Sequence, residues 1–177
     1  IKKFNYFIQA IVIYLFFLIG RILGIKISRK VFAFLFSLLG PFIKSKKIVN
    51  NNLKIFFEKN SKFKKDEIIK NMWRNYGMTF IEYIFLDNFF KKKTEVEVIG
   101  EINLADVIRE NNPVIFISGH FANFELMSME ITKKNISLAT IYRPLNNIFL
   151  NPFMEHLRKK YICKNQIKKG INGVKEA

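Results

Sequence analysis

PVIFISGHFANFELM, residues 113–127, decides the fold that the sequence predicts. Its first six residues form a continuous apolar run of strand length, which is typical of a strand buried on both faces. Gly119 permits a sharp turn after that run. The residues from about 122 to 134 then have the character of a helix, with basic residues and an asparagine as stop signals. The stretch therefore predicts a strand, a turn and a helix in succession.

Short strands and helices alternate around this stretch. EVEVIG (95–100) alternates polar and apolar residues and predicts a strand, as does SLATIY (137–142). INLADVIREN (102–111) and FLNPFMEHLRKKY (149–161) predict helices. This alternation predicts an α/β fold, in which helices flank a mixed sheet.

The segment FNYFIQAIVIYLFFLIG (4–20) carries no charge and reaches the short end of the length of a transmembrane helix. More basic residues follow it than precede it, which favours a cytoplasmic C-terminal flank. A helix lying in the membrane interface is the alternative. A signal peptide is disfavoured, because no small-residue cleavage site follows.

Further helices are predicted between this segment and the first predicted strand. A second apolar stretch (31–43) should end as a helix at Gly40-Pro41, and helices are expected over residues 47–57 and 66–85. We expect residues 1–45 to form a membrane anchor with interfacial helices, and residues 46–177 to form a separate domain.

The net charge of +16, from 30 basic and 14 acidic side chains, indicates an anionic partner. Each Lys or Arg near an anionic bilayer contributes about 1 kcal/mol to binding. A membrane surface and an acidic protein are both candidate partners, and the alternative is a Lys-rich chain in which lysine is simply the common surface residue. Nucleic acid is disfavoured, because no nucleic-acid-binding motif is present and the basic residues are scattered among large apolar ones. Cys163 is the only cysteine, which excludes an internal disulfide.

His120 and Glu125 are separated by five positions. On one continuous helix their side chains would point about 140° apart and would not meet. They can meet if His120 lies in the turn after the strand and Glu125 in the first turn of the helix, where the helix dipole favours its negative charge. A carboxylate placed there can orient an imidazole that acts as a general base. The alternative is a histidine packed at a helix start beside an unrelated glutamate.

Other chemistries fit less well. With two histidines and no H-E-x-x-H motif, a zinc site is not expected. Neither a G-x-S-x-G elbow nor a phosphate-binding glycine loop is present.

The His120–Glu125 motif looks like the H-x4-D/E signature of glycerolipid-type acyltransferases, and the chain as a whole resembles the bacterial lipid A biosynthesis acyltransferases. VIGEINLADVIRENNPVIFISGHFANFEL is similar to the catalytic block of that family. IYRPLNNIFLNPFMEHLRKKY is similar to the following block, and IKKGINGVKEA to the start of another. The family continues beyond this point, so we expect an N-terminal fragment whose catalytic domain is incomplete.

The resemblance implies a role for each matching residue. His120 would be the general base and Glu125 its partner, while Gly119 shapes the turn and Asn123 lies beside the site. Arg143 would bind a phosphate or sugar group of the acceptor. Lys169 and its neighbour Gly170 lie in a further family-like block, and Lys169 would add a substrate contact.

The resemblance also implies substrates, partners and a location. The acyl donor would be acyl carrier protein, the acceptor a lipid A precursor, and no cofactor or metal would be needed. The enzyme would work at the cytoplasmic face of the bacterial inner membrane. Two alternatives stay open: an acceptor such as a lysophospholipid, glycerol phosphate or another glycolipid, and a membrane-bound module without catalysis.

Overall fold

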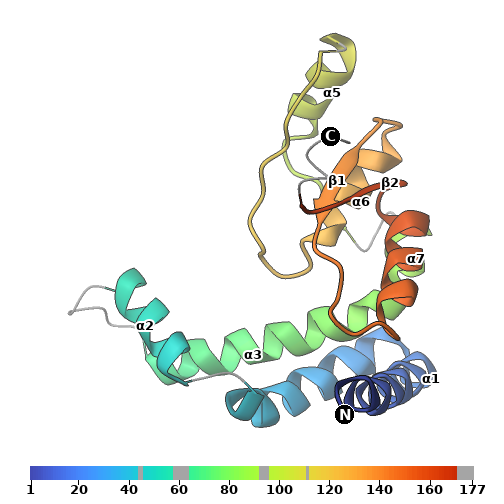
Figure 1. The fold of residues 1–177 in the computed structure, drawn as a ribbon. Coiled ribbons are helices and arrows are strands. Elements are labelled where there is room, and N and C mark those ends of the chain that lie inside the picture. Colours follow the sequence, from blue (N-terminus) through green and yellow to red (C-terminus); the bar gives the residue numbers. More distant parts are fainter. Residues whose placement is uncertain (44–45, 58–63, 92–95, 111, 171–177) are drawn as a thin grey trace. The chain divides into compact units, whose positions relative to one another are not determined.

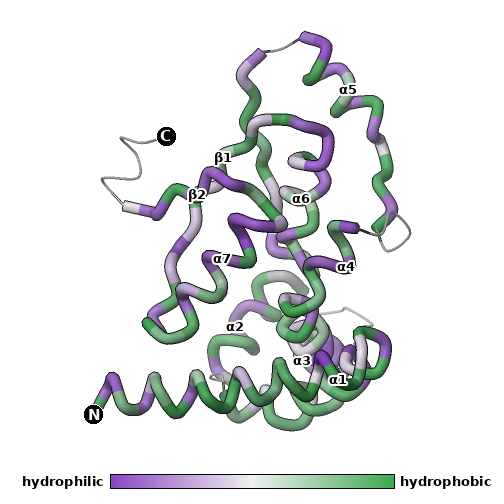
Figure 2. The backbone as a smooth tube through the Cα atoms, turned by 90° about the vertical axis from the view of Figure 1, so that its right-hand side faces the viewer, coloured by the Kyte–Doolittle hydropathy of each residue, from purple (hydrophilic) through white to green (hydrophobic). Residues whose placement is uncertain are grey.

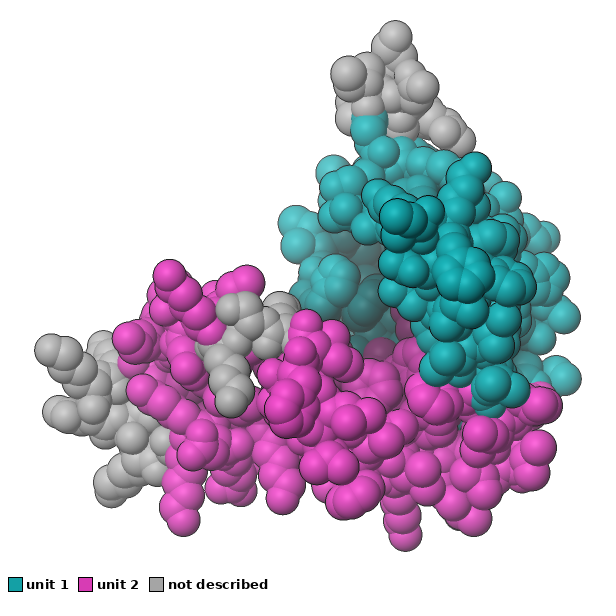
Figure 3. All heavy atoms as spheres, turned by 60° about the horizontal axis from the view of Figure 1, so that its bottom comes forward, with its two compact units in different colours: residues 1–15, 85–177 teal, residues 16–84 magenta. Residues whose placement is uncertain are grey.

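The computed structural model describes residues 1–43, 46–57, 64–91, 96–110 and 112–170 (Figure 1). The predicted α/β class is confirmed: most of these residues are helical, and a small parallel sheet lies among the helices of the C-terminal half. The chain divides into two compact units, coloured separately in Figure 3. Unit 1 consists of Ile1–Leu15 and Phe85–Ala177, and unit 2 of Phe16–Ile84.

The first helix, α1 (Lys2–Ile43), contributes to both units and contains one break. Gly24 lies at φ 73° and ψ 161°, a non-helical conformation that glycine adopts without steric cost. α1 is long and apolar enough to cross a membrane, by length and composition alone. Figure 2 colours the backbone by hydropathy and shows apolar residues along most of α1.

The predicted end of a helix at Gly40-Pro41 is wrong, because α1 continues to Ile43. Proline removes only one hydrogen bond of the last turns. The Trp73 ring lies directly against Gly40, where it would overlap any Cβ. Packing against a large aromatic ring therefore offsets the loss of that hydrogen bond.

Unit 2 is completed by α2 (Lys46–Phe56) and α3 (Lys65–Glu82), which agree with the helices predicted over 47–57 and 66–85. Phe80 of α3 is central to its packing. The centroid of its ring lies 5.1 Å from that of Phe17 and 5.3 Å from that of Phe36, both on α1. An ion pair adds to this packing, since Arg29 Nε donates to Glu82 Oε1 at 2.6 Å and the Glu82 side chain is buried.

The 3-10 turn η1 (Tyr83–Phe85) leads into unit 1. There α4 (Leu86–Lys91), α5 (Glu101–Glu110), α6 (Glu125–Lys133) and α7 (Asn151–Tyr161) accompany the strands β1 (Ala139–Tyr142) and β2 (Asn165–Lys168). β1 and β2 are parallel and joined through α7, with Ala139 opposite Asn165 and Tyr142 opposite Lys168. The α4, α6, α7 and β2 elements supply a core of buried side chains that includes Leu86, Phe89, Met129, Leu157 and Ile167.

Several elements of unit 1 match the sequence-based predictions. The strand expected over 137–142 is β1, and the helices expected over 102–111 and 149–161 are α5 and α7. The helix expected over about 122–134 is α6, which begins later, at Glu125. β2 was not predicted, because its sequence NQIK contains a single apolar residue and so carries no strand pattern.

Two predicted strands are wrong. Residues 113–118 have no strand partner among the described residues, and neither do residues 96–100 of the segment 95–100. Ile115 and Ile117 are largely exposed. A parallel strand of this apolar kind is stable only with hydrogen-bonded neighbours and covered faces, and the sheet of the described residues supplies neither to this run.

Gly77 of α3 provides a test of the packing in unit 2. A Cβ at this position would overlap the carbonyl oxygen of Phe32 and come within 2.9 Å of the Phe36 Cβ. Gly77→Ala should therefore lower the free energy of unfolding by about 1–3 kcal/mol, although alanine favours helix. Asn71→Ala, on the exposed side of the same helix, should leave stability unchanged or slightly raised. Thermal unfolding followed by circular dichroism would measure both, and equal effects would contradict the packing.

Candidate active site

His120 lies in the turn that the sequence predicts. The backbone N–H of Phe121 donates to the carbonyl oxygen of Gly119 at 2.9 Å, which closes a tight turn around His120. The imidazole is exposed, and its ring centroid lies 4.1 Å from that of Phe124. A solvent-accessible imidazole that is packed on one side can exchange a proton with a bound substrate.

The chain bends sharply between His120 and α6. Ala122 has φ 47°, in the left-handed region that costs a residue with a Cβ about 1–2 kcal/mol. The neighbouring Asn123 side chain is buried. The bend brings the chain from the exposed turn back into the core of unit 1 within two residues.

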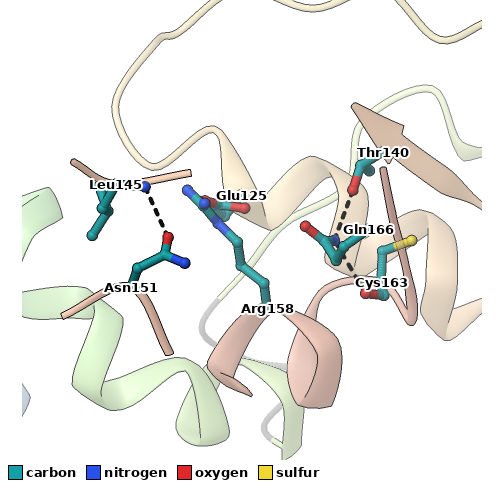
Figure 4. A network of polar contacts seen from close by, with 7 residues as sticks. All are labelled: Glu125, Thr140, Leu145, Asn151, Arg158, Cys163 and Gln166. Carbon is teal, nitrogen blue, oxygen red and sulfur yellow. Dashed lines mark hydrogen bonds and ion pairs between the residues drawn. The ribbon is translucent and has the colours of Figure 1, made fainter. Parts of the chain in front are cut away.

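Glu125 is the first residue of α6, as the sequence-based argument required, and its side chain is buried. Its Oε1 accepts a hydrogen bond from Arg158 Nε at 2.7 Å and lies 2.6 Å from Arg158 Nη2 in an ion pair. Figure 4 shows Arg158 extending from α7 to this carboxylate. The side chains are 9% and 13% exposed, so the pair is largely shielded from water, where removal of one partner is costly.

Arg158 was not predicted as a site residue. Its signal was present in the spacing of Asn151, Glu155 and Arg158, which recur at helical intervals and so share one face of α7. The sequence alone does not indicate that this polar face points towards β1 and α6 rather than towards solvent. The Arg158 guanidinium also lies 5.6 Å from the centroid of the Tyr142 ring.

Glu155 is the centre of a second polar cluster beside the site. The hydroxyl of Tyr142 donates to Glu155 Oε1 at 2.5 Å, and Asn151 Nδ2 donates to the same oxygen at 2.9 Å. Asn151 Oδ1 in turn accepts from the backbone N–H of Leu145 at 2.8 Å (Figure 4). The cluster therefore fixes the start of the loop that follows Arg143.

This cluster shifts two pKa values. Burial, with the hydrogen bond to Glu155, raises the pKa of Tyr142 from 10.0 to about 12. The hydrogen bond from Tyr142 is the main cause that holds the pKa of Glu155 below its ordinary value of 4.5. Both shifts favour a neutral phenol that donates to an ionised carboxylate.

Arg143 and Lys169 follow the two strands directly. Tyr142 and Lys168 are opposite each other in the parallel register, and the backbone N–H of Lys169 donates to the carbonyl oxygen of Tyr142 at 2.8 Å. Both basic side chains are exposed. Two positively charged side chains thus lie at the carboxyl end of both strands, which is the end where ligands bind in open α/β sheets.

A cavity of about 1290 Å³ in unit 1 collects several of these groups. His120, Glu125, Arg143 and Arg158 contribute to its lining. Apolar side chains of α5, α6, β1 and the segment 113–116 line much of the remainder. Gly119, Asn123 and Lys169 adjoin lining residues without lining the cavity themselves. Its size exceeds the roughly 300–1,000 Å³ of ordinary small-molecule sites, which leaves room for a long apolar substrate.

The structure therefore brings His120, Glu125 and Arg143 to one cavity and adds Arg158. Within it, His120 packs against Phe124, and Glu125 is held by Arg158. Among the residues that the structure describes, no group of three or more His, Cys, Asp or Glu side chains could hold a metal ion. The arrangement offers an accessible base, a buried carboxylate and a cationic rim around an apolar hollow.

Residues 1–175 match the model of one protein family, described as bacterial lipid A biosynthesis acyltransferase. Searches among curated proteins and among solved structures found no match.

The ion pair in the cavity gives a prediction for Arg158. Arg158→Ala removes the cation beside a buried carboxylate and should lower the free energy of unfolding by about 3–5 kcal/mol. Arg158→Lys should lose less than Arg158→Ala, because it keeps a positive charge beside Glu125. It should still be less stable than the wild type, because an ammonium does not reproduce the planar fork of the guanidinium. Chemical unfolding would measure both. The control is Lys159→Ala, which changes the exposed neighbour, and an equal loss in this control would contradict the assigned role.

The raised pKa of Tyr142 gives a second prediction. The folded protein keeps a phenol proton that the unfolded chain releases near pH 10.0, so the hydroxyl stabilises the fold most below that pH. The advantage of the wild type over Tyr142→Phe should then disappear between pH 10 and about 12. Unfolding of both proteins across this range would test it. In a Glu155→Gln background the pH dependence of the difference should shrink, and an unchanged dependence would refute the assignment.

Proposed function

We propose a donor, an acceptor and a mechanism for this chain, which belongs to the bacterial lipid A biosynthesis acyltransferase family and is an acyltransferase. In this proposal it transfers a fatty acyl chain from acyl carrier protein to a hydroxyl of a lipid A precursor. The observation that carries the proposal is that His120, Glu125 and Arg143 all line one cavity with many apolar neighbours.

His120 acts as the general base in this reaction. Its imidazole removes the proton of the acceptor hydroxyl while the oxygen attacks the carbonyl carbon of the acyl thioester. The tetrahedral intermediate then collapses, the carbon–sulfur bond breaks, and the imidazolium returns its proton to the leaving thiolate. The products are an ester and the free thiol of the carrier protein, without a covalent acyl-enzyme.

Glu125 stabilises the imidazolium that forms in this step. A carboxylate beside a catalytic histidine fixes the tautomer and favours the protonated ring. Arg158 is a positioning residue here, because its guanidinium holds Glu125 Oε1 in one place. The sharp bend at Ala122 sets the path of the chain between the base and this carboxylate.

The two substrates occupy different parts of the cavity. The apolar walls contributed by α5, α6 and the segment 113–116 take the acyl chain. Arg143 binds a phosphate or sugar group of the acceptor, and Lys169, at the same end of the sheet, adds a second positive charge. Gly119 and Asn123 shape the turn and bend that carry His120.

A membrane location accompanies this function. Residues 1–45 form the membrane-associated part and residues 46–177 the catalytic part, at the cytoplasmic face of the bacterial inner membrane. The apolar helix α1 supports this placement. The net charge of +16 would attract both an anionic bilayer and an acidic carrier protein, and it would raise the rate of their encounter.

His120→Ala should lower the rate of acyl transfer by about 10²–10⁴-fold, because a general base contributes on that order. The assay follows a radiolabelled acyl group from acyl carrier protein to a lipid A precursor in mixed micelles. His156→Ala is a matched control, since His156 is the other histidine of the chain and lies exposed on α7. Unfolding curves would verify that both variants fold. A His120→Ala protein with undiminished transfer would rule out His120 as the base.

The acceptor is tested separately with the wild-type protein. A panel of lipid A precursor, lysophospholipid and glycerol phosphate is offered with one acyl donor. The proposal requires the lipid A precursor to be the best acceptor. Preference for another lipid would keep the base and change the substrate.

A further inference from the structure

The loop between β1 and α7 packs on the N-terminal half of α1 within unit 1. The side-chain amide of Asn147 donates to the carbonyl oxygen of Tyr6 at 2.8 Å, and the hydroxyl of Tyr14 donates to the carbonyl oxygen of Phe149 at 2.9 Å. The Tyr14 ring also meets that of Phe153, with centroids 5.6 Å apart. These contacts run from residue 6 to residue 14, so the loop follows α1 for about 12 Å.

The rest of this half of α1 exposes apolar side chains. Phe4, Ile8, Ile11 and Leu15 recur at helical spacing and lie on one face, away from the buried Ala10. Nothing in unit 1 covers that face among the described residues, since all four side chains are more than 40% exposed.

The exposed surface of α1 continues into the loop. The rings of Phe7 and Phe149 meet edge to face with centroids 5.5 Å apart, yet they remain 47% and 39% exposed. Ile148, the next residue towards the sheet, is 53% exposed, and Leu145 is also exposed. Residues far apart in the sequence thus form one apolar surface of aromatic and aliphatic side chains. An apolar surface of this extent is typical of a site that meets a membrane or another protein.

We propose that this surface, formed by residues 2–15 of α1 and residues 145–149 of the loop, inserts into the interface of an anionic lipid bilayer, with residues 2–15 lying along the membrane rather than crossing it. The inference deepens the membrane location of the proposed function and rests on it. It assigns the loop after Arg143 as a second lipid contact of the enzyme.

The contacts of the loop argue against a crossing helix. If residues 2–15 crossed the hydrocarbon layer, which is roughly 30 Å thick, the loop packed along about 12 Å of the helix would have to enter it as well. Irregular backbone exposed to lipid is not tolerated at that depth, because its N–H and C=O groups have no partners. At the interface, headgroups and water supply those partners while the apolar side chains reach the acyl chains.

The charge of the neighbouring residues suits an anionic lipid surface. Lys2 and Lys3 are exposed at the start of α1, and Arg143 is exposed at the start of the loop. Lys and Arg at the rim of an apolar surface bind anionic headgroups, and each raises the affinity about fivefold. The combination of large apolar side chains with a basic rim is the composition of an interfacial membrane surface.

The proposal is tested by the depth of tryptophan in vesicles of phosphatidylethanolamine and phosphatidylglycerol. Trp73 is the only tryptophan of the chain, so a Trp73→Phe background allows single probes at Ile8→Trp and Ile148→Trp. Lys164→Trp, in an exposed position between α7 and β2, is the control. Lipids brominated either near the headgroup or near the chain end quench the fluorescence according to depth.

We expect Ile8→Trp and Ile148→Trp to be quenched most by bromine near the headgroup, and Lys164→Trp to be little quenched. Quenching of Ile148→Trp no greater than that of the control would overturn the proposal. So would quenching of Ile8→Trp that is strongest for bromine near the chain end, because that result requires a crossing helix.

A second probe covers the case in which Trp73→Phe does not fold. An environment-sensitive dye on Ile148→Cys, with the buried native Cys163 retained, should shift to the blue on addition of the same vesicles. An unshifted spectrum would overturn the proposal. Different results contradict the inference and the proposed function. Quenching of both probes without acyl transfer by the wild-type protein would contradict the function alone. Quenching of Ile8→Trp without quenching of Ile148→Trp would contradict the inference alone.

Discussion

The ion pair between Glu125 and Arg158 is the constraint on which the site depends. Glu125 begins α6 and Arg158 lies on α7, so a hydrogen bond and an ion-pair contact to one carboxylate oxygen tie the helix after the histidine turn to the helix between the strands. A carboxylate this deeply buried requires a cation or several donors nearby. The requirement fixes where α6 can begin, and with it how far the exposed turn at His120 lies from the sheet. A glutamate that was sought as the partner of a histidine is thus also a packing element of the fold.

Much of this arrangement followed from local sequence signals. Gly119 marked the turn, the negative charge of Glu125 suited the first turn of a helix, and the apolar character of residues 137–142 predicted β1. The prediction of a strand at residues 113–118 was wrong because a strand needs a hydrogen-bonded neighbour, and apolar composition alone does not supply one. β2 was missed for the converse reason: NQIK has no strand pattern and is held in place by β1. Arg158 stood in a basic run, and only the path of α7 shows that it turns inwards.

The short loop between β1 and α7 in unit 1 makes polar contacts at its start and apolar contacts further along. At its start, Arg143 lines the cavity and Asn151 holds the backbone of Leu145. Further along, Asn147 and Phe149 contact the N-terminal half of α1. The loop therefore joins the charged rim of the cavity to the most apolar helix of the chain over a few residues. In the proposed reaction such a junction would serve to bring a water-soluble acyl donor and a lipid acceptor together, because these two substrates would arrive from different phases.

The hydrogen bond between Asn147 and Tyr6 links residues 141 positions apart in the chain. At a synthesis rate of about 5–20 residues per second, residue 147 leaves the ribosome roughly 7–28 s after residue 6. The first helix thus emerges long before the loop that packs on it, whereas β1, α7 and β2 follow one another closely and can fold as soon as they appear. The C-terminal elements of unit 1 consequently pack on α1 last, after this helix has left the ribosome and formed its first contacts.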